Sequence, residues 1–287
     1  MVVLVTGANG QLGQALQSIS GNYPEIDFVF CSSSDLDITK KESCEAVFIK
    51  YKPNYCLNAA AYTAVDKAES EPEKAQLINV IGARNLAEAC KEYDIILIHI
   101  STDFVFDGTN KTSYKEEDTP NPTGVYGLTK LQGEKAIQET FDNYFIIRTS
   151  WVYSQFANNF MKTMLRLASE RDSLSVVNDQ IGTPTNAVDL AEALISIITQ
   201  TYSLQPTVYN LFGIYNFSNE GQCSWYDFAK EIFEINSIKI NLSAIPTTSF
   251  PTPAKRPAFS VLDKTKIKKV FQVEIKDWKE SLKACKI

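Results

Sequence analysis

Directly after Met1 the chain reads Val2-Val3-Leu4-Val5-Thr6-Gly7-Ala8-Asn9-Gly10-Gln11-Leu12-Gly13, and this stretch decides the fold. Its apolar, β-branched beginning predicts a short strand, and residues 14–20 predict a helix. The glycines between them allow a tight turn and close backbone approach, while the helix N-terminus offers unpaired N–H groups to a pyrophosphate. The position after an N-terminal strand favours a dinucleotide site. Such turns also serve as plain connectors, and the spacing G-x-x-G-x-x-G departs from the stricter G-x-G-x-x-G.

Segments typical of strands and of helices alternate from this stretch to residue 153. The periodic segment 72–93 predicts a long amphipathic helix. Short apolar runs predict further strands at 28–31, 55–58, 95–100, 144–152 and 208–213. This alternation predicts an α/β fold with a doubly wound parallel sheet, the Rossmann arrangement, and a smaller mixed α/β lobe at the C-terminal side.

Two later segments are placed to contact a dinucleotide. Asp37-Ile38 follow the second strand, where a dinucleotide fold carries an acid for the ribose of NAD or a basic residue for a 2′-phosphate. Because Ser32 to Ser34 can bond to either group and Asp37 can equally cap a helix, NADH or NADPH is left open. Ala60-Ala61-Tyr62 follow the third strand. Small residues there allow close approach to a flat ligand, or tight packing of helix on sheet.

Tyr126 and Lys130 are four positions apart in a predicted helix, so their side chains lie on one face of it. A lysine ammonium nearby favours the phenolate, and we expect it to lower the tyrosine pKa toward neutrality. Thr102 and Asp103 stand at the carboxyl end of the strand at 95–100, the sheet edge that holds ligands. A threonine hydroxyl there could hold a carbonyl oxygen against the phenol. His99, the only histidine, is expected to be a buried core residue.

The charge and composition of the chain indicate which classes of binding partner to exclude. The 287 residues carry a net charge of −6, with a sequence pI of about 5.1 and no basic stripe, so we expect no nucleic-acid partner. No apolar run approaches the roughly 20 residues that span a bilayer, so we expect no membrane partner. The six cysteines are scattered, without the spacing of metal or redox motifs, which predicts reduced thiols and a cytoplasmic protein.

Seven segments in order resemble a known family, the extended short-chain dehydrogenases, and within it the dTDP-4-dehydrorhamnose reductases. The resemblance extends over nearly the whole chain, which makes it more specific than any single motif. The segments are Thr6–Gly13, Asn58–Glu69, Ser101–Gly108, Tyr126–Lys130, Arg148–Tyr153, Asn178–Thr185 and Lys255–Pro257.

The resemblance implies reduction of a nucleotide-sugar ketone with NADPH or NADH. It assigns Thr102, Tyr126 and Lys130 to catalysis, with Lys130 also on the nicotinamide ribose, and Thr102, Asp103 and Trp151 to the substrate. Arg256 could pair with the diphosphate or be structural. The cofactor residues are Gly7, Gly10, Gln11, Leu12, Gly13, Asp37, Ile38, Ala60, Ala61, Tyr62, Tyr126 and Lys130.

The regular alternation of strands and helices stops after residue 153, and this change predicts the domain boundaries. We assign residues 1–153 and 186–214 to the dinucleotide-binding domain, and residues 154–185 and 215–287 to the nucleotide-sugar-binding lobe. Some members of the family that the chain resembles carry a glutamate after the glycine loop that is associated with a magnesium-mediated dimer. Here that place reads Gln14-Ala15, so we carry over no metal and leave a homodimer open.

Three other functions remain to be weighed against the reductase. Dehydration needs an acid and a base, which the dehydratases of the same superfamily carry as Asp-Glu directly after the threonine; here Asp103 is followed by Phe104, which takes no proton. A 4-epimerase is left open, and it would recycle the cofactor where a reductase consumes it. A non-catalytic subunit, similar to the regulatory β subunit of methionine adenosyltransferase, is also left open, because that protein retains similar motifs.

Overall fold

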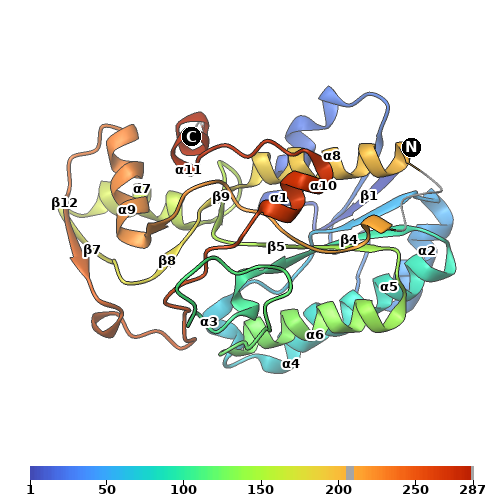
Figure 1. The fold of residues 1–287 in the computed structure, drawn as a ribbon, viewed down its shortest axis with the longest axis horizontal. Coiled ribbons are helices and arrows are strands. Elements are labelled where there is room, and N and C mark those ends of the chain that lie inside the picture. The colour runs from blue at the N-terminus through green and yellow to red at the C-terminus, as the bar shows by residue number, and fades with distance from the viewer. Residues whose placement is uncertain (205–209, 286–287) are drawn as a thin grey trace.

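A sheet of six parallel strands forms the centre of the computed structural model, which describes residues 1–204 and 210–285 (Figure 1). The strand order is β10-β5-β4-β3-β1-β2, and every pairing in it is parallel. The doubly wound parallel sheet is therefore confirmed. Its strands are Val2–Thr6 (β1), Asp27–Cys31 (β2), Tyr55–Asn58 (β3), Ile96–Thr102 (β4), Tyr144–Thr149 (β5) and Gly213–Asn216 (β10).

Helices cover both faces of this sheet (Figure 1). Successive residues of a strand point to opposite faces, so Val3 and Val5 pack with one layer and Leu4 with the other. The first layer holds α1 (Gln11–Ile19), α8 (Ala187–Ser203) and α10 (Thr265–Phe271). The second layer holds α2 (Lys41–Tyr51), α5 (Gly82–Glu92) and α6 (Val125–Thr140).

The long helix predicted at 72–93 is confirmed, with one irregular turn. It begins as α4 (Pro72–Gln76), passes through a π-helical turn at Leu77–Ile81, and continues as α5. Asn79 lies at the centre of the π turn and is 2% exposed. Turns of this kind are frequent at functional sites because they re-aim a side chain within a helix.

Two predicted strands differ from the structure. The strand expected at 208–213 is wrong in its bounds: residues 208 and 209 lie outside the described residues, and β10 begins only at Gly213. The strand expected at 144–152 ends at Thr149, because Trp151 adopts a positive φ of 46°. The chain then resumes as β6 (Val152–Tyr153), which pairs with β9 (Thr185–Asn186). An apolar run alone does not reveal such a bend.

A smaller lobe lies at the other end of the molecule (Figure 1). Its aromatic core is built around Phe228 and Trp278. The helices and strands of the lobe are α7 (Phe160–Glu170), α9 (Trp225–Ile235), α11 (Trp278–Ala284), the parallel pair β7 (Ser173–Val177) and β12 (Asn241–Ile245), and the antiparallel pair β8 (Ile181–Gly182) and β11 (Cys223–Ser224). The predicted domain boundaries remain a prediction. Residues 265–271 of the assigned lobe pack as α10 against the sheet.

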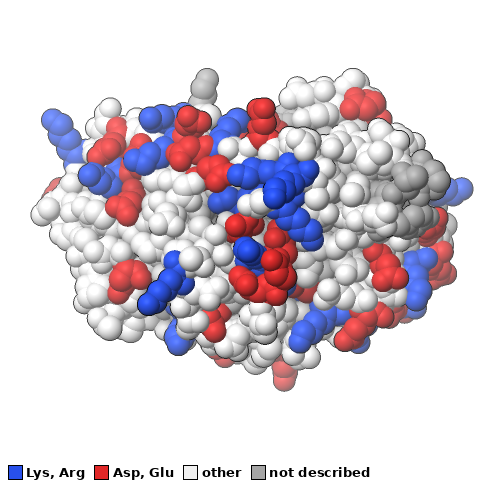
Figure 2. Space-filling model, viewed as in Figure 1, with Lys and Arg blue, Asp and Glu red and all other residues white. Residues whose placement is uncertain are grey.

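The chain also contains short helical segments, and its surface carries charges of both signs (Figure 2). The remaining helical turns are Ser20–Asn22, α3 (Val65–Ala68), Asp103–Val105 and Thr247–Ser249. Acidic and basic side chains are interspersed over the face shown in Figure 2. Of the helices in residues 1–204 and 210–285, none has the length and apolar character needed to span a bilayer.

We expect Gly7→Ala to weaken both folding and cofactor binding. Gly7 has a φ of +66°, and a Cβ there would lie 2.7 Å from the backbone nitrogen of Ala60. A side chain where φ is positive is destabilising by more than about 1 kcal/mol, and the backbone contact adds to that. Urea unfolding and NADPH titration measure the two effects. Gly21→Ala is the matched control, because nothing lies within 4 Å of a Cβ there; equal behaviour of the two variants would contradict the expectation.

Candidate active site

The candidate site lies at the carboxyl ends of β1, β3 and β4, which are neighbours in the sheet. The chain leaves β1 toward β2 on one side and then crosses to β3 on the other, which makes this edge a topological switch point. Open α/β sheets bind ligands in the crevice at such a point. The glycine turn and Ala60 lie in the loops that follow β1 and β3, and Thr102 is the last residue of β4, so three of the predicted segments lie at this edge.

The glycine loop is held against the loop after β3. The amide of Ala60 donates to Thr6 Oγ1 at 3.2 Å, and a Cβ on Gly13 would lie 2.5 Å from the Gly7 carbonyl oxygen. Helix α1 begins after Gly10, and no side chain caps its N-terminus. This is the arrangement that a diphosphate requires, with close backbone approach and a helix N-terminus left to a ligand.

Gln11 and Leu12 have structural contacts in addition to their predicted role. Leu12 is buried in the core between α1 and the sheet. The Gln11 amide nitrogen donates to the carbonyl oxygen of Val152 at 3.1 Å, and its oxygen accepts from Ser154 and Asn159, each at 3.0 Å. The glycine loop is thereby fixed to the segment that leads into the smaller lobe.

Asp37 and Ile38 follow β2, and the side chains of both contact other residues of the chain. The Asp37 carboxylate accepts from the amide and hydroxyl of Thr39, and these hydrogen bonds lower its pKa. Ile38 is buried and contacts Gly82, where a Cβ would lie 2.7 Å from its side chain. Asp37 therefore stabilises a local turn with Thr39 and does not cap α2, whose N-cap is Lys40.

Asn79 joins the loop after β3 to the helix that carries Tyr126. Its amide oxygen accepts from the Tyr62 amide at 2.8 Å, and its nitrogen donates to the Tyr62 carbonyl at 3.2 Å and to Thr129 Oγ1 at 3.1 Å. Thr129 lies between Tyr126 and Lys130 on α6. An asparagine inside a helical pattern is the only signal that the sequence gives for this contact.

Tyr126 is half-buried on α6, with its ring edge-to-face on Phe104 at 5.5 Å. Burial raises the pKa of Tyr126 to about 12, while a hydrogen bond with Thr102 opposes the rise and the charge of Asp103 adds to it. The expected lowering of the Tyr126 pKa is therefore wrong for this structure. The physical reason is that Lys130 directs its ammonium elsewhere.

Lys130 is 1% exposed, and its ammonium lies against β4. Nζ donates to the carbonyl oxygen of Ile100 at 2.7 Å and lies 3.1 Å from Nε2 of His99. Burial lowers the pKa of Lys130 to about 8, with the negative charge of Glu134 opposing the shift. His99 is buried as predicted, but its contact with Lys130 was missed, because a residue inside an apolar strand gives no signal of what lies across from it.

A buried ion pair lies one turn beyond Lys130 along α6. Glu134 accepts from Arg148 Nε at 3.0 Å and from its Nη2 at 2.7 Å, and Ser101 donates to the same carboxylate at 2.5 Å. The side chains of Glu134 and Arg148 are 1% and 2% exposed. This group ties α6 to β4 and β5, and so fixes the helix that carries Tyr126 and Lys130.

Asp103, Trp151 and Arg256 take three different positions. Asp103 is buried beside Thr102, and burial raises its pKa to about 6 against the hydrogen bonds of Ser260 and Thr102. Trp151 stacks on Trp225, with ring centroids 3.5 Å apart. Arg256 makes a two-pronged ion pair with Asp66, at 2.9 and 2.7 Å. Its guanidinium thus already has a carboxylate partner, and a contact with a diphosphate stays a prediction.

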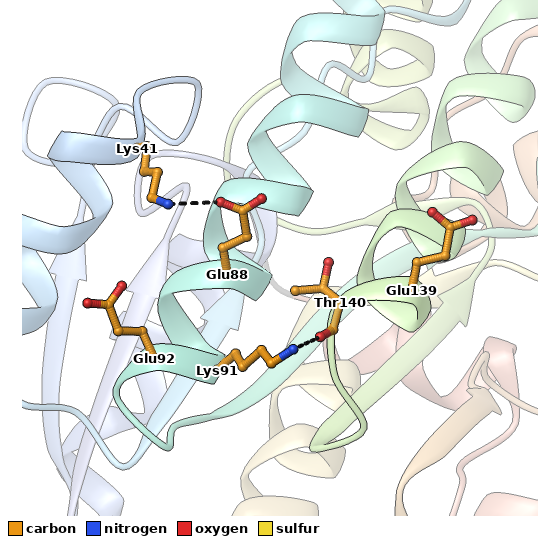
Figure 3. Close-up of a pocket in the computed structure, with 6 residues that line it drawn as sticks. All are labelled: Lys41, Glu88, Lys91, Glu92, Glu139 and Thr140. Carbon is orange, nitrogen blue, oxygen red and sulfur yellow. Dashed lines mark hydrogen bonds and ion pairs between the residues drawn. The ribbon is translucent and has the colours of Figure 1, made fainter.

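A surface hollow elsewhere is distinct from this site (Figure 3). Lys41 and Glu88 form an ion pair at 3.2 Å, and Lys91 donates to the Thr140 carbonyl at 2.9 Å. Thr140 ends α6, about 20 Å along the helix from Tyr126, so the hollow lies toward the opposite edge of the sheet. It is lined by Lys41, Glu88, Lys91, Glu92, Glu139 and Thr140. Among the described residues there is no group of three or more His, Cys, Asp or Glu side chains arranged to hold a metal ion.

Comparison with known proteins identifies the family. The family model described as RmlD substrate binding domain matches residues 1–286. A dTDP-4-dehydrorhamnose reductase from Aggregatibacter actinomycetemcomitans is 42% identical to the chain, over 98% of the chain and 97% of that relative. The chain belongs to the dTDP-4-dehydrorhamnose reductase family. The resemblance read from its motifs is confirmed.

Solved structures of the dTDP-4-dehydrorhamnose reductase family agree with this fold. A member from Clostridium acetobutylicum is 41% identical with a TM-score of 0.93, and one from Bacillus anthracis, solved in complex with NADP, is 40% identical with a TM-score of 0.92. Each match covers 99% of this chain and 98% of the other. A UDP-glucose 4-epimerase from Thermus thermophilus, 19% identical with a TM-score of 0.81, shares the fold alone.

Proposed function

We propose that this protein reduces the C4 ketone of dTDP-4-dehydro-6-deoxy-L-mannose to give dTDP-L-rhamnose, with NADPH or NADH as the hydride donor. One observation supports the proposal most: in a chain of the dTDP-4-dehydrorhamnose reductase family, Tyr126 shares a hydrogen bond with Thr102 at the end of β4, and Lys130 extends from the same helix to β4. The relatives carry the name of this activity. The roles of the site residues follow from the resemblance of their motifs to this family together with their chemistry.

The residues at the switch point fit a dinucleotide. Gly7, Gly10 and Gly13 would hold the diphosphate at the uncapped N-terminus of α1, and Ala60 and Ala61 would lie along the cofactor after β3. When bound, the nicotinamide supplies the hydride. The Ser32–Ser34 hydroxyls remain candidates for a ribose hydroxyl or a 2′-phosphate, and Ser32 and Ser34 share a hydrogen bond at 2.7 Å. Each activity assay therefore compares NADPH with NADH.

Tyr126 is proposed as the proton donor to the alkoxide that forms at C4. With a pKa raised to about 12, its phenol is protonated at neutral pH and has a proton to give. Thr102, which shares a hydrogen bond with Tyr126, would orient the carbonyl oxygen toward the phenol. Lys130, with a third N–H beyond its contacts to Ile100 and His99, would hold the nicotinamide ribose.

Phe104 weighs against dehydration across C5–C6. Its ring packs on Tyr126 in the position where a dehydratase carries an acid or base, and it can take no proton.

Epimerisation differs from reduction in its use of cofactor. Stoichiometric consumption of NADPH or NADH with dTDP-4-dehydrorhamnose, generated in situ, is the expected result and tests the proposal. Cofactor recycling would indicate an epimerase. Absence of reduction together with capture of a synthetase partner would indicate the non-catalytic subunit.

We expect the rate of ketone reduction to fall as pH rises through about 8. The pKa of Lys130 is lowered to about 8 by burial, so the folded protein loses this ammonium well below the ordinary lysine pKa of 10.5. Below that pH Lys130 is charged and Tyr126 is protonated, and above it the charge is lost first, because the pKa of Tyr126 is about 12. The pH profile of kcat measures this alkaline limb, the fall in rate as pH rises through about 8. A rate that is flat to pH 10 would contradict the expectation.

A further inference from the structure

His99 lies between two groups of the candidate site, in the middle of β4. It is the only histidine of the chain and is 1% exposed. Its Nδ1 is 2.9 Å from Nδ2 of Asn58 on β3, and its Nε2 is 3.1 Å from Nζ of Lys130 on α6. Both ring nitrogens therefore face nitrogen atoms that carry hydrogens.

A neutral imidazole cannot accept from both neighbours, because one ring nitrogen bears a hydrogen and the other is the acceptor. Two arrangements resolve the conflict. A half-turn of the Asn58 amide would place its oxygen opposite Nδ1–H and leave Nε2 to accept from a charged Lys130. Thr6 Oγ1, 2.6 Å from the Asn58 side chain, would then accept from the amide nitrogen. Alternatively, Asn58 donates to Nδ1, and Nε2–H donates to an uncharged Lys130.

The first arrangement gives the charged Lys130 an acceptor, although the Thr6 hydroxyl and the Ala60 amide, which donate to Asn58 Oδ1 at 2.6 and 3.2 Å, then lose that oxygen. The amide of Ala60 keeps its other acceptor, Thr6 Oγ1 at 3.2 Å, after the Asn58 amide has turned. The Lys130 ammonium, removed from solvent, then has acceptors for two of its three N–H groups, at Ile100 and His99. A buried ammonium without such acceptors would be strongly unfavourable.

We propose that His99 is a positioning residue of the reductase, which in its Nδ1–H tautomer accepts a hydrogen bond from Lys130 and aims the remaining ammonium N–H at the cofactor. The inference rests on the proposed function, in which Lys130 holds the nicotinamide ribose. Through Asn58 and Thr6, the same hydrogen bonds connect Lys130 to the end of β1, where the glycine loop begins.

The surrounding charges favour a neutral ring. Burial and the Lys130 charge hold the pKa of His99 well below 6.5, so the imidazole stays uncharged at neutral pH. Glu134 on α6 is the anion that acts on Lys130, and it is itself paired with Arg148 of β5. Tyr126 and Asp103 also lie at this edge of the sheet, and the charge of Asp103 acts on Tyr126. Lys130 Nζ contacts the Ile100 carbonyl at 2.7 Å and His99 at 3.1 Å.

Because the chain has a single histidine, ¹⁵N-histidine labelling of an untagged protein reports on this ring alone. At neutral pH we expect a neutral imidazole with its hydrogen on Nδ1 and an accepting Nε2. The Nε2 signal is expected to change as pH passes through about 8, and to lose that change in Lys130→Met. A hydrogen on Nε2 at neutral pH, or an Nε2 signal that is the same in Lys130→Met, would overturn the proposal.

Two substitutions test the consequence for turnover. His99→Gln keeps an oxygen acceptor near the position of Nε2, whereas His99→Met keeps the side-chain length without one. We expect His99→Met to lower kcat about tenfold, the effect of one hydrogen bond to a charged group, with little change in KM for the keto sugar. Its alkaline limb should move to lower pH, and His99→Gln should retain the wild-type limb. A limb that coincides in His99→Met and the wild type would contradict the positioning role.

The two measurements separate the possible failures. The spectrum needs no substrate, so it decides the His99 contact even if the wild type shows no reduction, which would overturn only the proposed function. If His99→Met does not fold, the wild-type spectrum and the alkaline limb of His99→Gln still test whether His99 positions Lys130. NADPH titration of each folded variant shows whether a lost rate reflects lost cofactor binding.

Discussion

Replacing Tyr126 with phenylalanine is expected to lower kcat by about 10²- to 10⁴-fold, the usual effect of removing a positioned acid. The ring would keep its edge-to-face contact with Phe104, so the fold and the cofactor site should persist. Only the hydroxyl that shares a hydrogen bond with Thr102 is lost. Oxidation of NADPH or NADH with the keto sugar measures kcat, and fluorescence titration measures cofactor affinity, which we expect to be within about twofold of wild type.

Tyr93→Phe is the matched control for this variant. Tyr93 is also half-buried, and it packs on Phe48 in the helical layer, away from the loops that follow β1, β3 and β4. It loses the same hydroxyl, so its turnover should stay at the wild-type level. Undiminished turnover in Tyr126→Phe would remove the tyrosine from the proposed mechanism. Equal losses in both variants would point to a general effect of removing a hydroxyl.

The largest expected effect on stability is that of Arg148→Met, at about 3–5 kcal/mol, the range seen when one partner of a buried ion pair is removed. The substitution leaves the Glu134 carboxylate buried, with Ser101 as its remaining hydrogen-bond donor. Because α6 packs through Glu134 against β4 and β5, turnover should fall along with stability. Urea unfolding measures the loss as a shift in midpoint with an unchanged slope.

The cause of that loss is tested by removing both charges. The double variant Glu134→Leu, Arg148→Met buries no unpaired charge, and we expect it to be more stable than Arg148→Met alone. If the double variant is as unstable as the single one, lost packing rather than a buried charge is the cause. Arg166→Met serves as the control, since Arg166 pairs with Glu170 on the exposed side of α7. Its change should be no more than about 1 kcal/mol.

Much of the fold could be predicted because its signals are local. The apolar run of β1, the glycines after it and the repeated alternation of strand and helix are each written within a few residues, and together they predict a parallel doubly wound sheet. The bend at Trp151 and the late start of β10 could not be predicted in the same way. Both depend on contacts with distant segments, such as the pairing of β6 with β9.

Part of the candidate site could likewise be predicted from local signals, and part could not. Tyr126 and Lys130 could be placed together because four residues along a helix return to the same face. Thr102 could be added because parallel strands end at one edge. The direction of the Tyr126 pKa was predicted wrongly. Spacing along α6 shows that Lys130 is near, but not that its ammonium contacts Ile100 and His99 while burial acts on the phenol.

The sequence by itself determined the sheet, the family and the residue types that a hydride-transfer site needs. Tertiary structure alone decided how those residues are charged and held. His99 meets Lys130, Glu134 meets Arg148 and Asn79 meets Tyr62 only when separate strands and helices pack together. The physical reason is that secondary structure follows from neighbours in the chain, whereas burial, pKa and hydrogen-bond partners follow from neighbours in space.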